Sequence, residues 1–388
     1  MKRIIMICVL ISCSLLLQAQ KRIGFYPGKV WPDNNGVHIN AHGGGILFYN
    51  DTYYWFGEHK TGGKEGNLAN VGVHVYSSNN LGDWKDEGIA LSISEDSTNL
   101  LVKGCIIERP KVIYNAKTKK FVMWFHHELK GQGYKAALTG LAISDKVTGP
   151  YTYLKSVNPN AGLWPENFPG EYKKRDQEPS LEGIGLQKPE GQLIVREGYF
   201  VRRDFTRGQM ARDMTLFVDD DGKAYHIHSS ENNQTLHIAE LTEDYQGFSG
   251  KYTRVLAGKA NEAPAIFKRE GKYYLITSGT TGWKPNPARL AVADHPFGPW
   301  QELGDPSRGT EDQVKTTFWS QSTYILPVAG KKNAYIYMGD RWTPENAIDG
   351  RYVWLPIQFE DDKPVLRWYD QWDLSVFDKI PKLPASTK

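Results

Sequence analysis

The sequence is poor in cysteine, which limits both its cross-linking and its metal chemistry. It has three cysteines, and Cys8 and Cys13 lie in an apolar N-terminal stretch. Once that stretch is removed, Cys105 stands alone, which excludes a disulfide within the remaining chain and a metal site built from cysteines. Stability must therefore come from a packed core, and a chain of 388 residues is long enough to form one.

A strong excess of charge of one sign is also missing. The formal net charge is +3 at pH 7, and removing Lys2 and Arg3 lowers it to +1. A nearly neutral surface gives no electrostatic reason to expect nucleic acid or an anionic membrane as a partner. We expect neither of these partners, no transmembrane segment, and a monomer.

The first residues, MKRIIMICVLISCSLLLQAQ, have the organisation of a secretory signal. A positively charged start precedes an apolar stretch, residues 4–17, that is too short to span a bilayer comfortably. Ala19 suits signal peptidase, so we predict a signal peptide over residues 1–19 and a protein exported to the periplasm or the extracellular space. The alternative is a lipoprotein anchored through Cys13, because LISC resembles a lipobox.

Long helical stripes are scarce, and short strands with tight turns take their place. Five segments repeat one unit: an apolar strand, a turn rich in Asn, Asp, Gly and Lys, and an aromatic strand. They begin at Ala41, Glu108, Arg212, Glu262 and Gln321. With further strand candidates between the copies, the pattern predicts an all-β fold, a five-bladed β-propeller over residues 20–388. A β-sandwich is the alternative.

The repeated unit begins with a different polar residue in each copy. In a propeller the innermost strand of each blade lines the central channel, so residues that open these strands meet at its mouth. The five leading residues are His42, Glu108, Asp213, Glu262 and Gln321.

Three carboxylates and a carboxamide in one pocket suit glycoside hydrolysis. That reaction needs a proton donor for the leaving oxygen and a group that activates water or attacks the sugar. Crowded like charges raise the pKa of one carboxyl, so that Glu262 beside Asp213 keeps its proton near neutral pH.

The segments AHGGGILFYNDTYYWFGE, ERPKVIYN, ARDMTLFVDDDGKAY, NEAPAIF and WSQS resemble glycoside hydrolase family 43. That resemblance implies an inverting propeller enzyme with Glu262 as general acid and Asp213 as the residue that orients it and tunes its pKa. The first segment is most similar to the exo-β-1,3-galactanase branch, which lacks the usual first-blade aspartate. The resemblance then implies that Gln321, assisted by Glu108, replaces the missing base and that galactose is released from arabinogalactan-type β-1,3-galactan.

The same resemblance suggests contacts to the substrate. These substrate-binding candidates are Glu58, His42, Tyr134, Asn232, Thr281 and Trp342, with Asn233 and Trp283 as further candidates. For any single tryptophan, packing in the core is an equally good explanation.

We expect no cofactor to be required. The histidines are scattered without metal-ligand spacing, and residues 219–222 (DDDG) are explained by a hairpin turn rather than a calcium loop. A structural Ca²⁺ ion in the channel remains an open alternative.

Residues 158–208 do not fit the repeat, and they predict a lid or a wall of a substrate subsite. The alternative is an insertion with no role in substrate binding. Two other functions also stay open. One is an α-L-arabinofuranosidase or β-xylosidase of the same family, and the other is a propeller that binds carbohydrate without cleaving it.

Overall fold

The structure is a computed structural model that describes residues 24–378. The predicted signal peptide, its cleavage site at Ala19 and the alternative anchor at Cys13 lie outside these residues. The longest helix among the described residues has eight residues, so none of them is long and apolar enough to cross a membrane.

Four sheets each contain four antiparallel strands in consecutive order. The first contains β1 (His42–Tyr49), β2 (Thr52–Lys60), β3 (Asn70–Ser78) and β4 (Lys85–Ser92). The second contains β5 (Ile106–Asn115), β6 (Lys120–Glu128), β7 (Leu138–Ser144) and β8 (Thr152–Val157). The third contains β9 (Met214–Val218), β10 (Ala224–Ser230), β11 (Thr235–Leu241) and β12 (Phe248–Val255). The fourth contains β13 (Glu262–Arg269), β14 (Lys272–Ser278), β15 (Arg289–Ala293) and β16 (Gln301–Gly304).

The remaining strands form two three-stranded sheets. One contains β18 (Gln321–Pro327), β19 (Tyr335–Arg341) and β20 (Arg351–Pro356). The other joins β17 (Ser307–Arg308), β22 (Lys363–Arg367) and β21 (Gln358–Glu360), with β17 parallel to β22.

The propeller of β-sheets is therefore confirmed, but the predicted number of five blades is wrong, because the described strands form six sheets. The last repeat does not continue into a fourth strand of its own sheet. After β20 the chain forms the β21–β22 hairpin, which pairs with β17 from the segment before that repeat. A two-residue strand such as β17 leaves no pattern in the sequence from which this sheet could be inferred.

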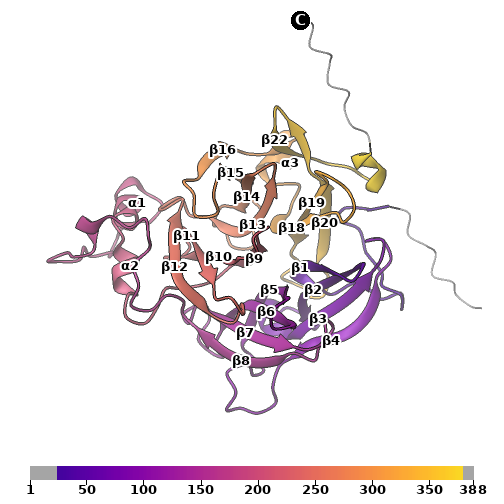
Figure 1. Ribbon diagram of the computed structural model, residues 1–388, viewed down its shortest axis with the longest axis horizontal. Helices are drawn as coiled ribbons and strands as arrows, with labels where there is room; N and C mark the ends of the chain where they lie inside the picture. Colours follow the sequence, from indigo (N-terminus) through magenta and orange to yellow (C-terminus); the bar gives the residue numbers. More distant parts are fainter. Residues whose placement is uncertain (1–23, 379–388) are drawn as a thin grey trace, which may run out of the picture.

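Helices are few and short. The α-helices are α1 (Pro189–Arg196), α2 (Tyr199–Arg203) and α3 (Glu311–Lys315), and the 3₁₀ helices are η1 (Gly66–Ala69), η2 (Gly170–Tyr172) and η3 (Leu374–Phe377). Residues 158–208 contain η2, α1 and α2 and no strand, and α1 and α2 project from one side of the molecule (Figure 1).

The inner strands meet around the centre and share a local irregularity. β1 lies beside β5 and β18, while β9 and β13 complete the circle. In β1, β5 and β13 the pairing shifts directly after the leading residue, which is a β-bulge. The residue at the bulge has a positive φ in each case: 57° at Gly43, 53° at Arg109 and 53° at Ala263.

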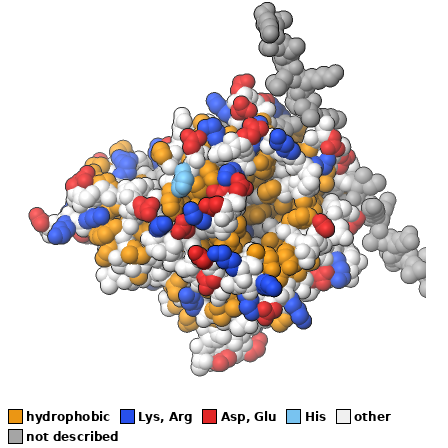
Figure 2. Space-filling view, in the orientation of Figure 1, with side chains coloured by type: hydrophobic (Ala, Val, Ile, Leu, Met, Phe, Trp, Pro, Cys, Tyr) orange, Lys and Arg blue, Asp and Glu red, His pale blue; other side chains and the backbone are white. Residues whose placement is uncertain are grey.

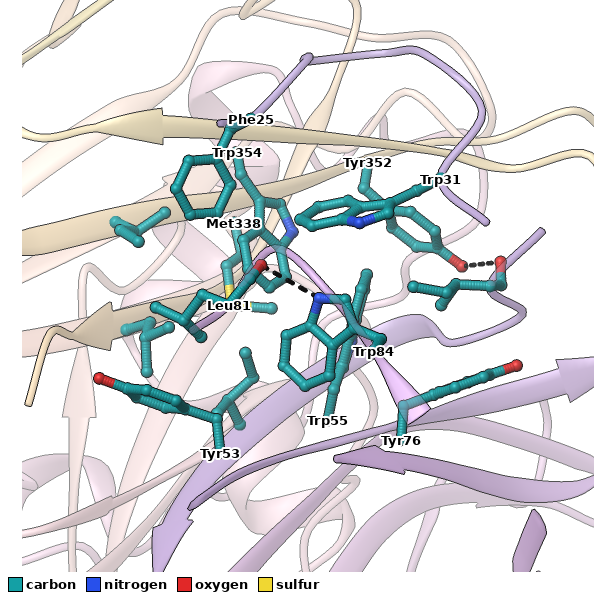
Figure 3. Close-up of a cluster of buried hydrophobic side chains, with 14 of the residues drawn as sticks. Phe25, Trp31, Tyr53, Trp55, Tyr76, Leu81, Trp84, Met338, Tyr352 and Trp354 are labelled. Carbon is teal, nitrogen blue, oxygen red and sulfur yellow. Dashed lines mark hydrogen bonds between the residues drawn. The ribbon is translucent and has the colours of Figure 1, made fainter. Parts of the chain in front are cut away.

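The ring is closed by aromatic packing between the two ends of the described chain. Phe25 pairs with Trp372 through two backbone hydrogen bonds, and their rings stack 4.1 Å apart. Trp31, Trp55 and Trp354 pack between the first sheet and β20 (Figure 3). This cluster joins the N-terminal segment, the first sheet and the C-terminal segment in one core.

Candidate active site

The leading residues lie where the inner strands begin. His42, Glu262 and Gln321 are the first residues of β1, β13 and β18, Glu108 is the third residue of β5, and Asp213 directly precedes β9. A hollow lies near the centre of the face seen in Figure 2, bordered in part by hydrophobic side chains. The contacts among these side chains determine which of them hold a proton and which are charged.

Arg109 connects two of the leading residues. Its Nη2 lies 3.1 Å from Asp213 Oδ2 and donates a hydrogen bond of 2.5 Å to Gln321 Oε1. Asp213 Oδ2 also accepts a hydrogen bond of 3.0 Å from the backbone N–H of Ala263, the bulge residue that follows Glu262. The third, fourth and last repeats are thereby joined at one point.

Glu262 is held in its neutral form at physiological pH. Burial, and next the negative charge of Asp213, raise the pKa of Glu262 to about 8. Its Oε1 accepts a hydrogen bond of 2.6 Å from Asn233 Nδ2, which fixes the carboxyl group in the site. A partly buried carboxylic acid that keeps its proton at pH 7 is suited to general acid catalysis.

Glu108 is held in the opposite state. Burial alone would raise the pKa of Glu108, but hydrogen bonds with His126 and Tyr134, together with the charge on His126, lower it to about 2. The distances to His126 Nδ1 and to the Tyr134 hydroxyl are both 2.7 Å, and Asn67 also donates to this carboxylate. Glu108 is therefore an ionised carboxylate.

His126 lies between two carboxylates. Its Nδ1 contacts Glu108 and its Nε2 contacts Glu128 Oε1 at 2.9 Å. Burial would lower the pKa of His126, but the two carboxylates raise it to about 9, so both ring nitrogens donate hydrogen bonds near neutral pH. The other oxygen of Glu128 accepts from the backbone N–H groups of Ala136 and Ala137, in the loop that carries Tyr134.

Gln321 is bound at both ends of its carboxamide. Oε1 faces Arg109, and Nε2 donates a hydrogen bond of 2.8 Å to the hydroxyl of Ser278 at the end of β14. The amide plane is thus fixed between Arg109 of the second sheet and Ser278 of the fourth.

The structure places the predicted substrate contacts in three different settings. Tyr134 joins the carboxylate group through Glu108. Glu58 is fully buried, where it accepts a hydrogen bond from the backbone of Arg109 and lies 2.8 Å from Lys60 Nζ. His42 has only 1% of its surface exposed and stacks on Trp342, with ring centres 4.9 Å apart.

His42 therefore does not join the carboxylates, although it leads its repeat. Among the described residues neither of its ring nitrogens has a hydrogen-bond partner, and burial is the first cause that keeps its pKa well below the ordinary value. Trp342 also lies under Lys60 Nζ at 4.4 Å and meets the exposed Trp283 edge-on.

Asn232 and Thr281 are both exposed on loops and bond within them. The backbone oxygen of Asn232 accepts from Gln234, and the Thr281 hydroxyl accepts from Asn286. The residue next to Asn232, Asn233, is the one that contacts Glu262.

Sequence reasoning missed Arg109, His126 and Ser278. A signal for His126 was present, because the antiparallel pairing of β5 with β6 sets it opposite Glu108. Arg109 directly follows its leading residue, but the equivalent position is Gly43 in the first repeat and Ala263 in the fourth, so the repeat gives no signal for a basic residue there. Ser278 is opposite Glu262 in the β13–β14 pair, yet its contact to Gln321 crosses to another sheet.

Among the described residues, Glu108, His126 and Asp213 offer atoms within 4.8 Å of one another, close enough to hold a metal ion together. Their oxygens and nitrogens already contact Tyr134, Glu128 and Arg109. The set thus fits a hydrogen-bonded group at least as well as a cation. In the DDDG turn, Asp219 binds Lys268 and Tyr273.

Comparisons with known proteins agree with this chemistry. Residues 197–363 match the model of glycosyl hydrolases family 43. A solved family 43 β-1,3-galactosidase, bound to galactodeoxynojirimycin, is 51% identical, covers 90% of this chain and 100% of its own, and superposes with a TM-score of 0.86. The exo-β-1,3-galactanase of Phanerochaete chrysosporium is 31% identical, with 92% of this chain and 68% of that chain covered and a TM-score of 0.71.

A β-D-galactofuranosidase of Aspergillus niger is 27% identical over 176 residues, which are 44% of this chain. That match spans half the length of the relative. Because the 51% identical galactosidase is matched over its whole length, the chain belongs to glycosyl hydrolases family 43 and is a glycoside hydrolase.

Proposed function

We propose that the protein is an exported, inverting exo-β-1,3-galactosidase that removes galactose from β-1,3-galactan of the arabinogalactan type. The observation that carries this proposal is that Glu262, whose raised pKa keeps its proton, lies beside Asp213, and that Arg109 links Asp213 to Gln321, a carboxamide in the place of a catalytic base. The two solved relatives named above act on β-1,3-linked galactose, which supports the same substrate class here.

In the proposed reaction Glu262 donates its proton to the glycosidic oxygen as the bond to the sugar breaks. Water attacks the anomeric carbon from the opposite face, so the released sugar has the inverted configuration. The proton that this water loses passes through the Gln321 carboxamide, by way of its imidic tautomer, to solvent, and Glu262 regains a proton from solvent. Burial, and next the charge of Asp213, raise the pKa of Glu262 and keep it protonated, and Arg109 holds Asp213 in place.

Gln321 is the proposed group that directs the attacking water. A carboxamide is a very weak base, so its role depends on a fixed orientation and on nearby negative charge more than on basicity. Asp213 is the carboxylate linked to Gln321, since Arg109 contacts both side chains. The ionised Glu108 adds to that charge from the other side of Asp213, because the two carboxylates have oxygens within 4.8 Å of each other.

The test is to incubate purified residues 20–388 with de-branched β-1,3-galactan and to follow the first product by proton NMR. We expect galactose that appears first as the α-anomer. Appearance of the β-anomer would refute inversion. Release of a pentose from arabinofuranosides or xylosides, with galactan untouched, would refute the galactose assignment.

Glu262→Gln is the matched control. It keeps the shape of the side chain and its contact to Asn233 but cannot donate a proton to the leaving oxygen. Galactose release should fall by ~100- to 10,000-fold while binding persists. A wild-type protein that binds galactan and releases no sugar from it would indicate a carbohydrate-binding propeller.

A further inference from the structure

Arg109 has a backbone conformation that its side chain makes costly. It occupies the β-bulge of β5 with a φ of 53°, in the left-handed region. A residue with a side chain is disfavoured in this region, because its Cβ comes too close to the following carbonyl oxygen. The same bulge in β1 and β13 holds Gly43 and Ala263, so the fold itself does not require a long basic side chain there.

The guanidinium group of Arg109 is buried, and both of its terminal nitrogens have partners. The residue is 5% exposed, and Nη1 donates a hydrogen bond of 2.7 Å to the backbone oxygen of Ser322. Nη2 contacts both Gln321 Oε1 at 2.5 Å and Asp213 Oδ2 at 3.1 Å. A single cation thus holds one proposed catalytic group from each of two sheets.

These contacts also decide which end of the Gln321 carboxamide faces Arg109. A guanidinium has donors and no acceptor, so only the amide oxygen can face it. At the other end Ser278 donates its own hydroxyl proton to the backbone oxygen of Gly279, which leaves its oxygen free to accept from Gln321 Nε2. Both contacts require the same orientation of the amide.

We propose that Arg109 is a positioning residue that sets the orientation of the Gln321 carboxamide and links it to Asp213 through one guanidinium nitrogen. This inference rests on the proposed role of Gln321 in directing the attacking water. Arg109 does not touch the reacting atoms in this assignment. It acts through Gln321, because its planar fork spans the Ser322 oxygen and the Gln321 oxygen together, which a lysine ammonium cannot do with the same geometry.

The test is a double-mutant cycle on turnover of β-1,3-galactobiose with Arg109→Lys, Gln321→Ala and the double variant. Arg109→Lys keeps the charge and loses the fork. We expect kcat to fall by about 10- to 100-fold, the loss typical of a misplaced catalytic group, with KM nearly unchanged. In the Gln321→Ala background Arg109→Lys should lower kcat little further, because the group that Arg109 positions is gone.

Arg269→Lys is the matched control. Arg269 is also a mostly buried arginine, paired with the carboxylates of Glu270 and Asp362, but it ends β13 at the opposite end from Glu262. The substitution should leave kcat per folded molecule unchanged, whatever it does to the melting temperature. Its effect should also be independent of Gln321→Ala. If instead the double variant loses kcat by the product of the two single fold-losses, Arg109 does not act through Gln321 and the proposal is overturned.

A crystal structure of Arg109→Lys tests the same inference without a substrate. The oxygen of the Gln321 carboxamide should turn away from residue 109, and a carboxamide in its wild-type orientation would contradict the proposal. This readout separates the two hypotheses. A wild-type protein that releases no galactose refutes the proposed function, whereas a fixed carboxamide in the variant refutes the role of Arg109.

Discussion

At the scale of single residues, the site depends on one carboxyl group that stays protonated beside one that does not. The pKa of Glu262 is raised to about 8, first by burial and then by the charge of Asp213, so the general acid should lose its proton as pH rises past 8. We predict that kcat/KM falls on the alkaline side of that value.

Asp213→Asn removes the charge that contributes to this shift and should move the alkaline limb of kcat/KM to lower pH. The measurement is a pH profile of kcat/KM for the wild type and the variant. Asp219→Asn serves as control, because Asp219 is bound to Lys268 and Tyr273 in a turn and should leave the profile unchanged. An alkaline limb that stays in place in Asp213→Asn would show that burial alone sets the pKa.

The same carboxyl group should make the folded protein less stable as pH rises. Between its ordinary value of 4.5 and about 8, Glu262 is protonated in the folded chain and ionised in the unfolded chain. The folded state then binds more protons, so the free energy of unfolding decreases with pH across this window. Glu262→Gln removes the effect and should be more stable than the wild type at pH 7.

Melting temperatures of both proteins from pH 4 to pH 8 measure this difference. The advantage of Glu262→Gln should be smallest near pH 4, where the wild-type carboxyl is protonated in both states, and should grow toward pH 8. A difference in melting temperature that stays constant from pH 4 to pH 8 would mean that the variant changes packing and that the protonation of Glu262 has no part in it.

At the scale of strands and loops, the repeated unit explains why part of the site is predictable. Each repeat leads into an inner strand, so aligning the copies is enough to bring Glu108, Asp213, Glu262 and Gln321 to one place. His42 shows the limit of that reasoning. It occupies an equivalent position but is buried against Trp342, and repeat spacing does not determine which way a side chain points.

The residues that fix the leading side chains come from other parts of the repeat. His126 lies on the second strand of its sheet, and Asn233 lies in a tight turn between β10 and β11. Their contacts depend on strand register and on turn geometry, which composition does not specify. The sixth sheet was missed for the same reason, since β17 pairs with a strand more than fifty residues later in the chain.

The segment 158–208 is attached to the third sheet through Arg254 of β12. Its guanidinium pairs with the buried Glu231 at 2.7 Å and donates to the backbone oxygens of Val195 and Arg196 in α1. Arg254→Met should lower the free energy of unfolding by about 3–5 kcal/mol, because Glu231 is left buried without its main cation.

Urea denaturation measures this loss, and limited proteolysis should show earlier cleavage within residues 158–208. Combining Arg254→Met with Glu231→Gln should recover part of the stability, since the uncompensated charge is then removed. A double variant no more stable than Arg254→Met would mean that the bonds to α1 carry the effect instead.

At the scale of the whole molecule, the ring must hold its first and last sheets together. Among the described residues, that junction is made by packing and hydrogen bonds, and Cys105 is a free cysteine. Trp31 lies at its centre: it is 2% exposed, packs on Trp55 and Trp354, and donates a hydrogen bond of 2.9 Å to the backbone oxygen of Gly82.

Trp31→Ala should therefore lower the free energy of unfolding by about 3–5 kcal/mol, through lost burial and the cavity that remains. Trp283→Ala is the control, because Trp283 is 46% exposed and its removal leaves no cavity in the core. Trp31 contacts segments at both ends of the described chain. Its loss should therefore lower the midpoint of one unfolding transition for the whole ring, measured by urea denaturation. If Trp31→Ala instead unfolds in two steps, the closure is not coupled to the rest of the propeller.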